Sequence, residues 1–122
     1  MKIALINENS QAPKNALIFE TLKKVAEPMG HECFNYGRYS AEDPVEKSYV
    51  QEGLLAAILL NSGAADFVVT GCGTGMGAML ALNSFPGVMC GWSLRFAFSK
   101  VELSGGVILH PLENGIFENF VK

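Results

Sequence analysis

The sequence predicts an α/β fold with a mainly parallel sheet, because segments typical of strands and of helices alternate along the whole chain. Short runs of consecutive apolar residues, such as Ile3–Ile6, are typical of strands buried on both faces of a parallel sheet. Between these runs, apolar residues recur every three or four positions, as they do on one face of a helix. Right-handed crossovers would then connect the parallel strands.

The predicted elements follow one another in a regular order. Strands are expected at residues 3–6, 31–36, 67–70, 88–90 and 107–109. Helices are expected between Pro13 and Gly30, at 48–61, 76–83 and 94–101, with the start of another at 114–122. The second of these helices is expected to have an apolar side formed by Val50, Leu54, Leu55, Ile58 and Leu59. Together these elements predict a three-layer α/β/α sandwich around a five-stranded, Rossmann-like sheet.

Length and composition limit the class of protein. The chain has 122 residues, 49% hydrophobic and 17% charged, with a net charge of −3, which predicts one globular domain over residues 1–122. Its lysines and arginines form no cluster, which argues against nucleic acid or an anionic membrane as a partner. The longest apolar stretch, Leu54–Leu60, is too short to cross a bilayer. Cys33, Cys72 and Cys90 match no metal or redox spacing, so we expect reduced thiols in a cytoplasmic protein and no metal site.

The segment Gly71–Gly77, with the sequence GCGTGMG, carries the strongest indication of chemistry. It follows the strand at 67–70 and precedes the helix at 76–83, so its glycines would let backbone N–H groups and a helix N-terminus face a ligand. Within it, Cys72 lies beside the positive end of that helix. Such a position stabilises a thiolate, which can act as a base or a nucleophile.

The sequence leaves several interpretations of this segment open. It could be a tight turn whose glycines serve packing alone. Gly73, Gly75 and Ala78 also satisfy the loose G-x-G-x-x-G/A pattern of dinucleotide binding, but no acidic residue ends the next strand. A lone cysteine at a strand end is usually a small buried hydrophobe, which suits Cys33 and Cys90, whereas the glycine neighbours of Cys72 favour an enzyme loop.

A second loop follows the first predicted strand and contains Glu8 and Asn9. Ligands of open α/β sheets bind at the carboxyl ends of strands. We therefore expect residues 7–11 and 71–77 to form one candidate site.

The run Cys72–Gly77, followed by Ala81–Asn83 and Pro86–Val88, resembles the signature of the type B ribose-5-phosphate isomerases and the related galactose-6-phosphate isomerase subunits. That signature is Cys-Gly-Thr-Gly-x-Gly, a short helix ending in Ala-Asn, then Pro-Gly and a strand. The opening Met1–Ala4 and the segment Gly37–Ser40 also fit the family.

The resemblance implies an enzyme that interconverts aldose and ketose sugar phosphates through an enediolate, without a cofactor or a metal. Cys72 would be the base that moves a proton between C1 and C2, and Thr74 would assist at the sugar oxygens or in ring opening. Substrate binding would involve Glu8, Asn9, Gly71, Gly73, Gly75, Met76, Gly77 and Asn83, with backbone N–H groups of the glycine loop holding the enediolate oxygen. The resemblance also implies a homodimer or higher homo-oligomer whose sites are completed by the neighbouring subunit, and Phe96 and Phe98 are candidates for that interface.

Several positions differ from the family pattern. Glu8-Asn9 stands where the family has Asp-His, Cys90-Gly91-Trp92 where it has Cys-His-Asp, and Glu102 where it has a further His. The C-terminal arginines of the family have no counterpart, so either the native chain continues beyond Lys122 or phosphate is bound otherwise. These differences keep a second hypothesis, a non-catalytic sugar- or anion-binding homologue or accessory subunit. Arg38, Arg95 and Lys100 are candidate anion partners, with a surface charge as the simpler interpretation of each.

Overall fold

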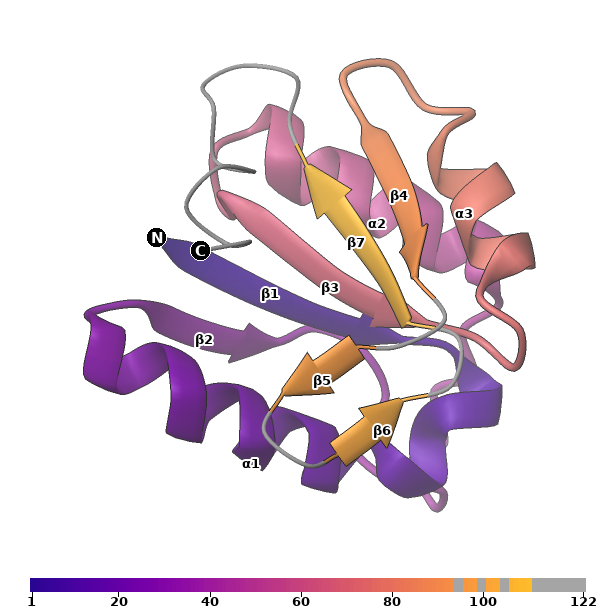
Figure 1. Cartoon of the computed structure of the whole chain (residues 1–122). Coiled ribbons are helices and arrows are strands. Elements are labelled where there is room, and N and C mark those ends of the chain that lie inside the picture. The colour runs from indigo at the N-terminus through magenta and orange to yellow at the C-terminus, as the bar shows by residue number, and fades with distance from the viewer. Residues whose placement is uncertain (94–95, 99–100, 104–105, 111–122) are drawn as a thin grey trace.

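The computed structural model describes residues 1–93, 96–98, 101–103 and 106–110 (Figure 1). Its central strand is β1 (Lys2–Asn7), which pairs in parallel with β2 (Glu32–Asn35) on one side and with β3 (Phe67–Gly71) on the other. Helices lie in the connections between these strands. The expected α/β class with a parallel sheet is thereby confirmed.

Two further strands extend the sheet beyond β3. Strand β7 (Gly106–His110) pairs with both β3 and β4 (Met89–Ser93), antiparallel to each, so the strand order is β2-β1-β3-β7-β4. The sequence predicted a strand at 107–109 but not its direction. A parallel neighbour would need a long crossover, whereas the chain reaches β7 from β4 through two short strands.

The helix expected at 94–101 is a wrong prediction. Strands β5 (Phe96–Phe98) and β6 (Val101–Leu103) pair there as an antiparallel two-stranded sheet. In β6, Glu102 stands between Val101 and Leu103, which is the alternation of a strand, and the residues of β5 are all apolar, as a short strand can be. The helix expected at 114–122 lies outside the described residues.

The other helices begin and end close to their predicted limits. The chain leaves β1 through a 3-10 helix, η1 (Asn9–Lys14), which contains Pro13, and continues into α1 (Asn15–Ala26) and a short 3-10 turn, η2 (Glu27–Met29). Gly30 ends this run with a left-handed φ of 83°. Helix α2 (Tyr49–Asn61) begins with a capping box between Ser48 and Gln51, and α3 (Met76–Leu82) follows the glycine loop.

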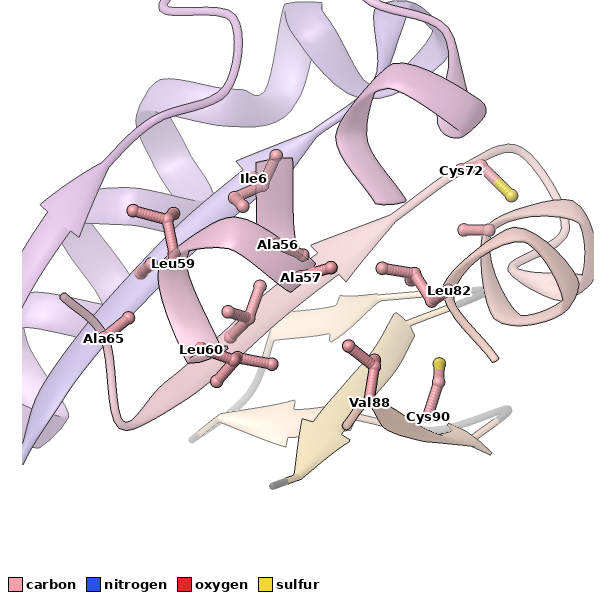
Figure 2. Close-up of a cluster of buried hydrophobic side chains, with 13 residues drawn as sticks. Ile6, Ala56, Ala57, Leu59, Leu60, Ala65, Cys72, Leu82, Val88 and Cys90 are labelled. Carbon is pink, nitrogen blue, oxygen red and sulfur yellow. The ribbon is translucent and has the colours of Figure 1, made fainter. Parts of the chain in front are cut away.

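The core consists of two apolar clusters, one on each face of the sheet, because successive side chains of a strand point to opposite faces. Ile3 and Leu5 of β1 pack with Ile18 and Leu22 of α1. Ala4 and Ile6 belong to the opposite cluster, which also contains side chains of α2 and α3: Ala56, Ala57, Leu59, Leu60, Ala78 and Leu82. Figure 1 shows α1 on one side of the sheet and α2 and α3 on the other, and Figure 2 shows the second cluster.

Helix α2 buries only part of the apolar side that the sequence predicted: Leu59 lies in the core and Leu55 packs against it, but the other three predicted residues do not. Val50, Leu54 and Ile58 are 54%, 50% and 55% exposed, whereas the buried residues of α2 are Glu52, Gly53, Ala56, Ala57, Leu59 and Leu60. At Gly53 a small residue is required because α3 and the segment after it lie close by: a Cβ there would lie 3.5 Å from the backbone of Ala81 and 3.0 Å from the ring of Phe85. Close packing between helices, and not total hydrophobicity, decides which side is buried.

Candidate active site

The carboxyl ends of β1 and β3 lie side by side and bring the two predicted loops together. Asn7 is in register with Gly71, and the backbone N–H of Glu8 donates to the Gly71 carbonyl oxygen at 3.3 Å. Cys72 follows Gly71 directly, so Glu8 and Cys72 extend from neighbouring strands at one edge of the sheet. This arrangement follows from the parallel pairing of β1 and β3.

Cys72 is buried, with 6% of its surface exposed, and its sulfur has a hydrogen-bond donor. The Sγ atom accepts a hydrogen bond from the backbone N–H of Gly75 at 3.1 Å. Gly75 has a left-handed φ of 78°, a conformation that glycine adopts at no steric cost. Figure 2 shows Cys72 at the edge of the apolar cluster, next to α3. The sulfur therefore has a backbone donor aimed at it, and a hydrogen bond is stronger in a water-poor setting than in water.

The rest of the glycine loop is more accessible. Gly73 and Thr74 are exposed, and a Cβ on Gly73 would lie 3.7 Å from the Ser10 hydroxyl, so the two loops face each other. The backbone N–H of Met76 donates to the Thr74 hydroxyl at 3.4 Å. Two of the backbone N–H groups expected to hold a substrate oxygen, those of Gly75 and Met76, therefore have acceptors inside the loop.

Glu8 and Asn9 have different surroundings. Glu8 is buried, and its Oε1 atom accepts a hydrogen bond from the Ser10 hydroxyl. The Asn9 side-chain oxygen accepts from the Lys47 backbone N–H at 2.8 Å, and the Asn9 backbone N–H donates to the Lys47 carbonyl oxygen at 3.2 Å. Asn9 thus ties the loop after β1 to the segment that leads into α2.

Arg38 is not the surface charge expected from the sequence. It is buried, and it donates to the Asn9 side-chain oxygen at 3.3 Å, to the Ala41 carbonyl oxygen at 2.9 Å and to the Asp43 carbonyl oxygen. A guanidinium carries several donors in a fixed plane, which suits it to collecting carbonyl oxygens of an irregular segment. Arg38 therefore organises residues 38–43 beside the site. Arg95 and Lys100 lie outside the described residues.

Asn83 is the C-cap residue of α3, and its amide contacts the start of β4. Its Oδ1 atom accepts from the Cys90 backbone N–H at 2.8 Å, and its Nδ2 atom donates to the Cys90 carbonyl oxygen at 3.0 Å. These bonds give Asn83 a structural role between α3 and β4. Its contact with a substrate stays a prediction.

The sequence interpretation missed Glu52, in the first turn of α2. Its side chain is only 1% exposed, and within the described residues neither carboxyl oxygen has a hydrogen-bond partner. The pKa of Glu52 is raised from 4.5 to about 10, mainly by burial; the Glu8 carboxylate and Cys72 contribute to the rise, and Lys47 opposes it. The signal was present in the sequence, because Glu52 lies four residues before Ala56 and eight before Leu60, on the side of α2 that proved to be buried.

The Ribose/Galactose Isomerase family profile matches residues 3–100, which include both loops and all of α2. This chain belongs to the Ribose/Galactose Isomerase family. The resemblance carried by the Cys72–Gly77 motif is thereby confirmed. No protein of curated function matches the chain.

Solved structures of this family resemble the chain over most of its length. A 4-deoxy-L-threo-5-hexosulose-uronate ketol-isomerase complexed with tartrate is 65% identical, with a TM-score of 0.75, over 78% of this chain and 45% of that protein. The ribose-5-phosphate isomerase LacAB_rpiB of Vibrio parahaemolyticus is 53% identical, with a TM-score of 0.70, over 73% and 42%. Ribose-5-phosphate isomerase B of Clostridium thermocellum is 27% identical, with a TM-score of 0.52, over 71% and 54%. The chain thus spans less than two thirds of each of these proteins.

Metal-ligand clusters, long apolar helices and the cysteines are the remaining features of the described part of this family member. Among its described residues, no three His, Cys, Asp or Glu side chains gather in the way a metal ion requires. No helix there has the length and apolarity needed to cross a membrane. All three cysteines are free, and Cys90 is part of an apolar cluster, as predicted.

Proposed function

We propose that this chain interconverts an aldose and a ketose, with Cys72 as the base that moves a proton between two neighbouring carbons. The observation that carries the proposal is the setting of Cys72, which is buried at the end of β3 with its sulfur 3.1 Å from the Gly75 backbone nitrogen, and which follows the residue that Glu8 contacts, Gly71. Proton abstraction next to a carbonyl needs a base in a fixed position and polar groups where negative charge develops. Cys72 and its loop supply a candidate for each.

The proposed reaction moves protons without net oxidation. The Cys72 thiolate takes the proton from C2, the C–H electron pair forms the C1–C2 double bond of an enediolate, and the resulting thiol returns a proton to C1. Thr74, exposed in the loop, would contact the sugar oxygens, and Glu8 would contact a hydroxyl at the rim. Asn9, Gly71, Gly73, Gly75, Met76, Gly77 and Asn83 complete the proposed binding residues.

The leading candidate substrate is a sugar phosphate. The family signature supports it, as does the 53% identical ribose-5-phosphate isomerase. A second candidate, an open-chain uronate, is favoured by one specific observation: the uronate ketol-isomerase is 65% identical to this chain. Both candidates are anions with a carbonyl next to a hydroxyl-bearing carbon, so the same proton transfer serves either.

We further propose that residues 1–122 form one domain with the five-stranded, three-layer architecture expected from the sequence, and that it works as a homodimer or higher homo-oligomer. In this oligomer, residues of the neighbouring subunit would complete the site.

The test is an isomerase assay of the purified protein on pentose phosphates, hexose phosphates and the deoxyhexosulose uronate, with Cys72→Ala in parallel. Cys33→Ala is the matched control, because Cys33 packs against the opposite cluster of the core. We expect turnover of one of these classes, a loss of at least about 10³-fold in kcat for Cys72→Ala, and a change below about twofold for the control.

The outcomes separate the hypotheses. Turnover that survives Cys72→Ala would keep an isomerase and remove Cys72 as its base. Saturable binding of a sugar or an anion without any turnover would instead support a non-catalytic binding protein on the same fold.

A further inference from the structure

The carboxyl group of Glu52 is the buried polar group that the proposed mechanism does not yet use. A glutamate is almost never fully buried unless it is paired, because removing its charge from water is costly. Glu52 is 1% exposed, and neither of its oxygens has a hydrogen-bond partner among the described residues. A buried group of this kind calls for an explanation, and one explanation is a partner that arrives with the substrate.

The position of Glu52 is held by several contacts. The backbone N–H of Glu52 donates to the Ser48 carbonyl oxygen at 3.0 Å, inside a helical turn that the Ser48–Gln51 capping box closes. Just before this turn, the backbone of Lys47 makes two hydrogen bonds with Asn9. The Lys47 N–H donates to the Asn9 side-chain oxygen, and the Lys47 carbonyl oxygen accepts from the Asn9 backbone N–H. The first turn of α2 is therefore attached to the same loop that carries Glu8.

The groups that act on the Glu52 carboxyl belong to the candidate site. Glu8 comes from the end of β1, Cys72 from the end of β3, and Lys47 from the segment before α2. Glu8 and Cys72 disfavour a negative charge on Glu52, and Lys47 favours it. Burial adds to the effect of the first two, and the raised pKa of Glu52 keeps this carboxyl neutral at physiological pH.

The two glutamates of the site have different partners. Glu8 accepts a hydrogen bond from the Ser10 hydroxyl on its Oε1 atom. Neither oxygen of Glu52 has a partner among the described residues, and a neutral Glu52 carries an O–H donor on one oxygen and an acceptor on the other. Glu52 can therefore give and accept a proton without first giving up a hydrogen bond.

We propose that Glu52 is a second proton carrier of the isomerisation, exchanging the hydroxyl protons of the substrate while Cys72 moves the carbon-bound proton. This inference rests on the proposed function.

The isomerisation has two separate proton transfers. An aldose becomes a ketose when one proton moves from C2 to C1 and another moves from the C2 hydroxyl to the carbonyl oxygen on C1. Cys72 performs the first. For the second, Glu52 gives its O–H proton to the oxygen on C1 and accepts the C2 hydroxyl proton on its other oxygen. Glu52 ends the cycle neutral, as it began, and no co-reactant is required.

The test compares Glu52→Gln with the wild type and with Glu46→Gln, a matched control on an exposed residue just before α2. Glutamine keeps the size and a donor but cannot pass a proton on. Two rates are measured in deuterated buffer on the substrate that the wild type turns over: conversion of aldose to ketose, and exchange of the C2 proton with solvent.

For Glu52→Gln we expect kcat for conversion to fall by about 10²-fold or more, with KM within about threefold of the wild-type value. Exchange at C2, which depends on Cys72, is expected to fall by less than about tenfold. Cys72→Ala is expected to lose both rates, and Glu46→Gln neither. A neutral Glu52 also predicts an infrared carbonyl band of a protonated carboxyl at pH 8, present in the wild type and in Glu46→Gln but missing from Glu52→Gln.

Three outcomes would overturn the inference. They are conversion by Glu52→Gln within threefold of the wild type, a parallel fall of conversion and exchange, and the absence of the carboxyl band from the wild type. An inactive wild type would overturn the proposed function and this inference together, whereas an active wild type beside an unaffected Glu52→Gln would overturn this inference alone. If Glu52→Gln does not fold, Glu52→Asp replaces it; the carboxyl is then withdrawn by one methylene, and conversion is expected to fall more than tenfold while exchange persists.

Discussion

The three cysteines of the chain show how surroundings distinguish residues of one type. Burial raises the pKa of Cys90 to about 12, and burial together with the nearby Glu27 raises that of Cys33, so both remain thiols at neutral pH. The Cys72 sulfur is also buried but accepts a hydrogen bond from a backbone N–H. The residue type alone offers three candidate bases, and the local donors single out Cys72.

At the same scale, Glu52→Gln is expected to raise the free energy of unfolding at neutral pH. The folded protein holds the Glu52 proton with a pKa of about 10, against an ordinary value of 4.5. Between these values the folded state binds more protons than the unfolded chain, so the stability of the wild type falls as the pH rises through this window. Removing the group should gain roughly 2–4 kcal/mol at pH 7 and almost nothing at pH 4.

Urea unfolding at pH 4, 7 and 9 measures this gain, with Glu46→Gln as the control. A difference between Glu52→Gln and the wild type that does not grow with pH would mean that Glu52 is ionised in the folded protein.

At the scale of elements, the start of α2 determines the shape of the site. The helix begins at a capping box, and its first turn carries Glu52 while the preceding Lys47 is bound to Asn9. The cap was readable from the sequence as a serine at the start of an apolar helix. The connection to Asn9 was not, because it joins residues 38 positions apart.

Ser48→Ala is expected to lower the free energy of unfolding by about 1 kcal/mol, because the backbone N–H of Gln51 loses its acceptor. Chemical denaturation measures the loss. Ser84→Ala is the control. Ser84 is exposed, its hydroxyl donates to the carbonyl oxygen of Leu80, four residues earlier, and it does not stand at the start of a helix. Equal losses in the two variants would show that the cap contributes nothing specific.

Gly37 marks the point where β2 ends against the end of β1. A Cβ on Gly37 would lie 2.4 Å from the Asn7 backbone nitrogen, so Gly37→Ala must push two backbone segments apart. We expect a loss of about 3 kcal/mol in the free energy of unfolding. In Gly30→Ala the new Cβ meets open space, and only the left-handed φ of 83° costs about 1 kcal/mol. Thermal unfolding of both variants measures the two losses. If Gly37→Ala lowered the melting temperature less than Gly30→Ala, the predicted clash at Gly37 would be wrong.

At the scale of the whole molecule, α2 presents an apolar stripe that stays exposed in the part of the chain that the structure describes. Val50, Leu54 and Ile58 follow one another every four residues, and each is about half exposed. An exposed apolar stripe of this length is typical of a surface that meets another protein. This stripe is therefore our candidate for the contact surface in the expected self-association. The side chains of Phe96 and Phe98, the earlier candidates, lie outside the described part.

Leu54→Lys is therefore expected to weaken self-association by at least about tenfold, because a buried lysine would have to give up its hydration at the interface. Light scattering and sedimentation across a range of protein concentrations measure the effect. Leu17→Lys is the control, since Leu17 is 58% exposed on α1, on the opposite side of the sheet. If both variants associate like the wild type, the stripe is not the contact surface.

The sequence by itself determined the α/β class, the positions of β1, β3, α2 and α3, and the glycine loop around Cys72. These features depend on local periodicity and on glycine, whose effects are confined to a few neighbouring residues. The tertiary structure decided the rest: the direction of β7, the antiparallel pairing of β5 with β6 in place of a helix, the buried side of α2 and the burial of Arg38 and Glu52. Each of these depends on which distant segment lies alongside, and the carboxyl group of Glu52 becomes a buried acid only when the folded chain removes it from water.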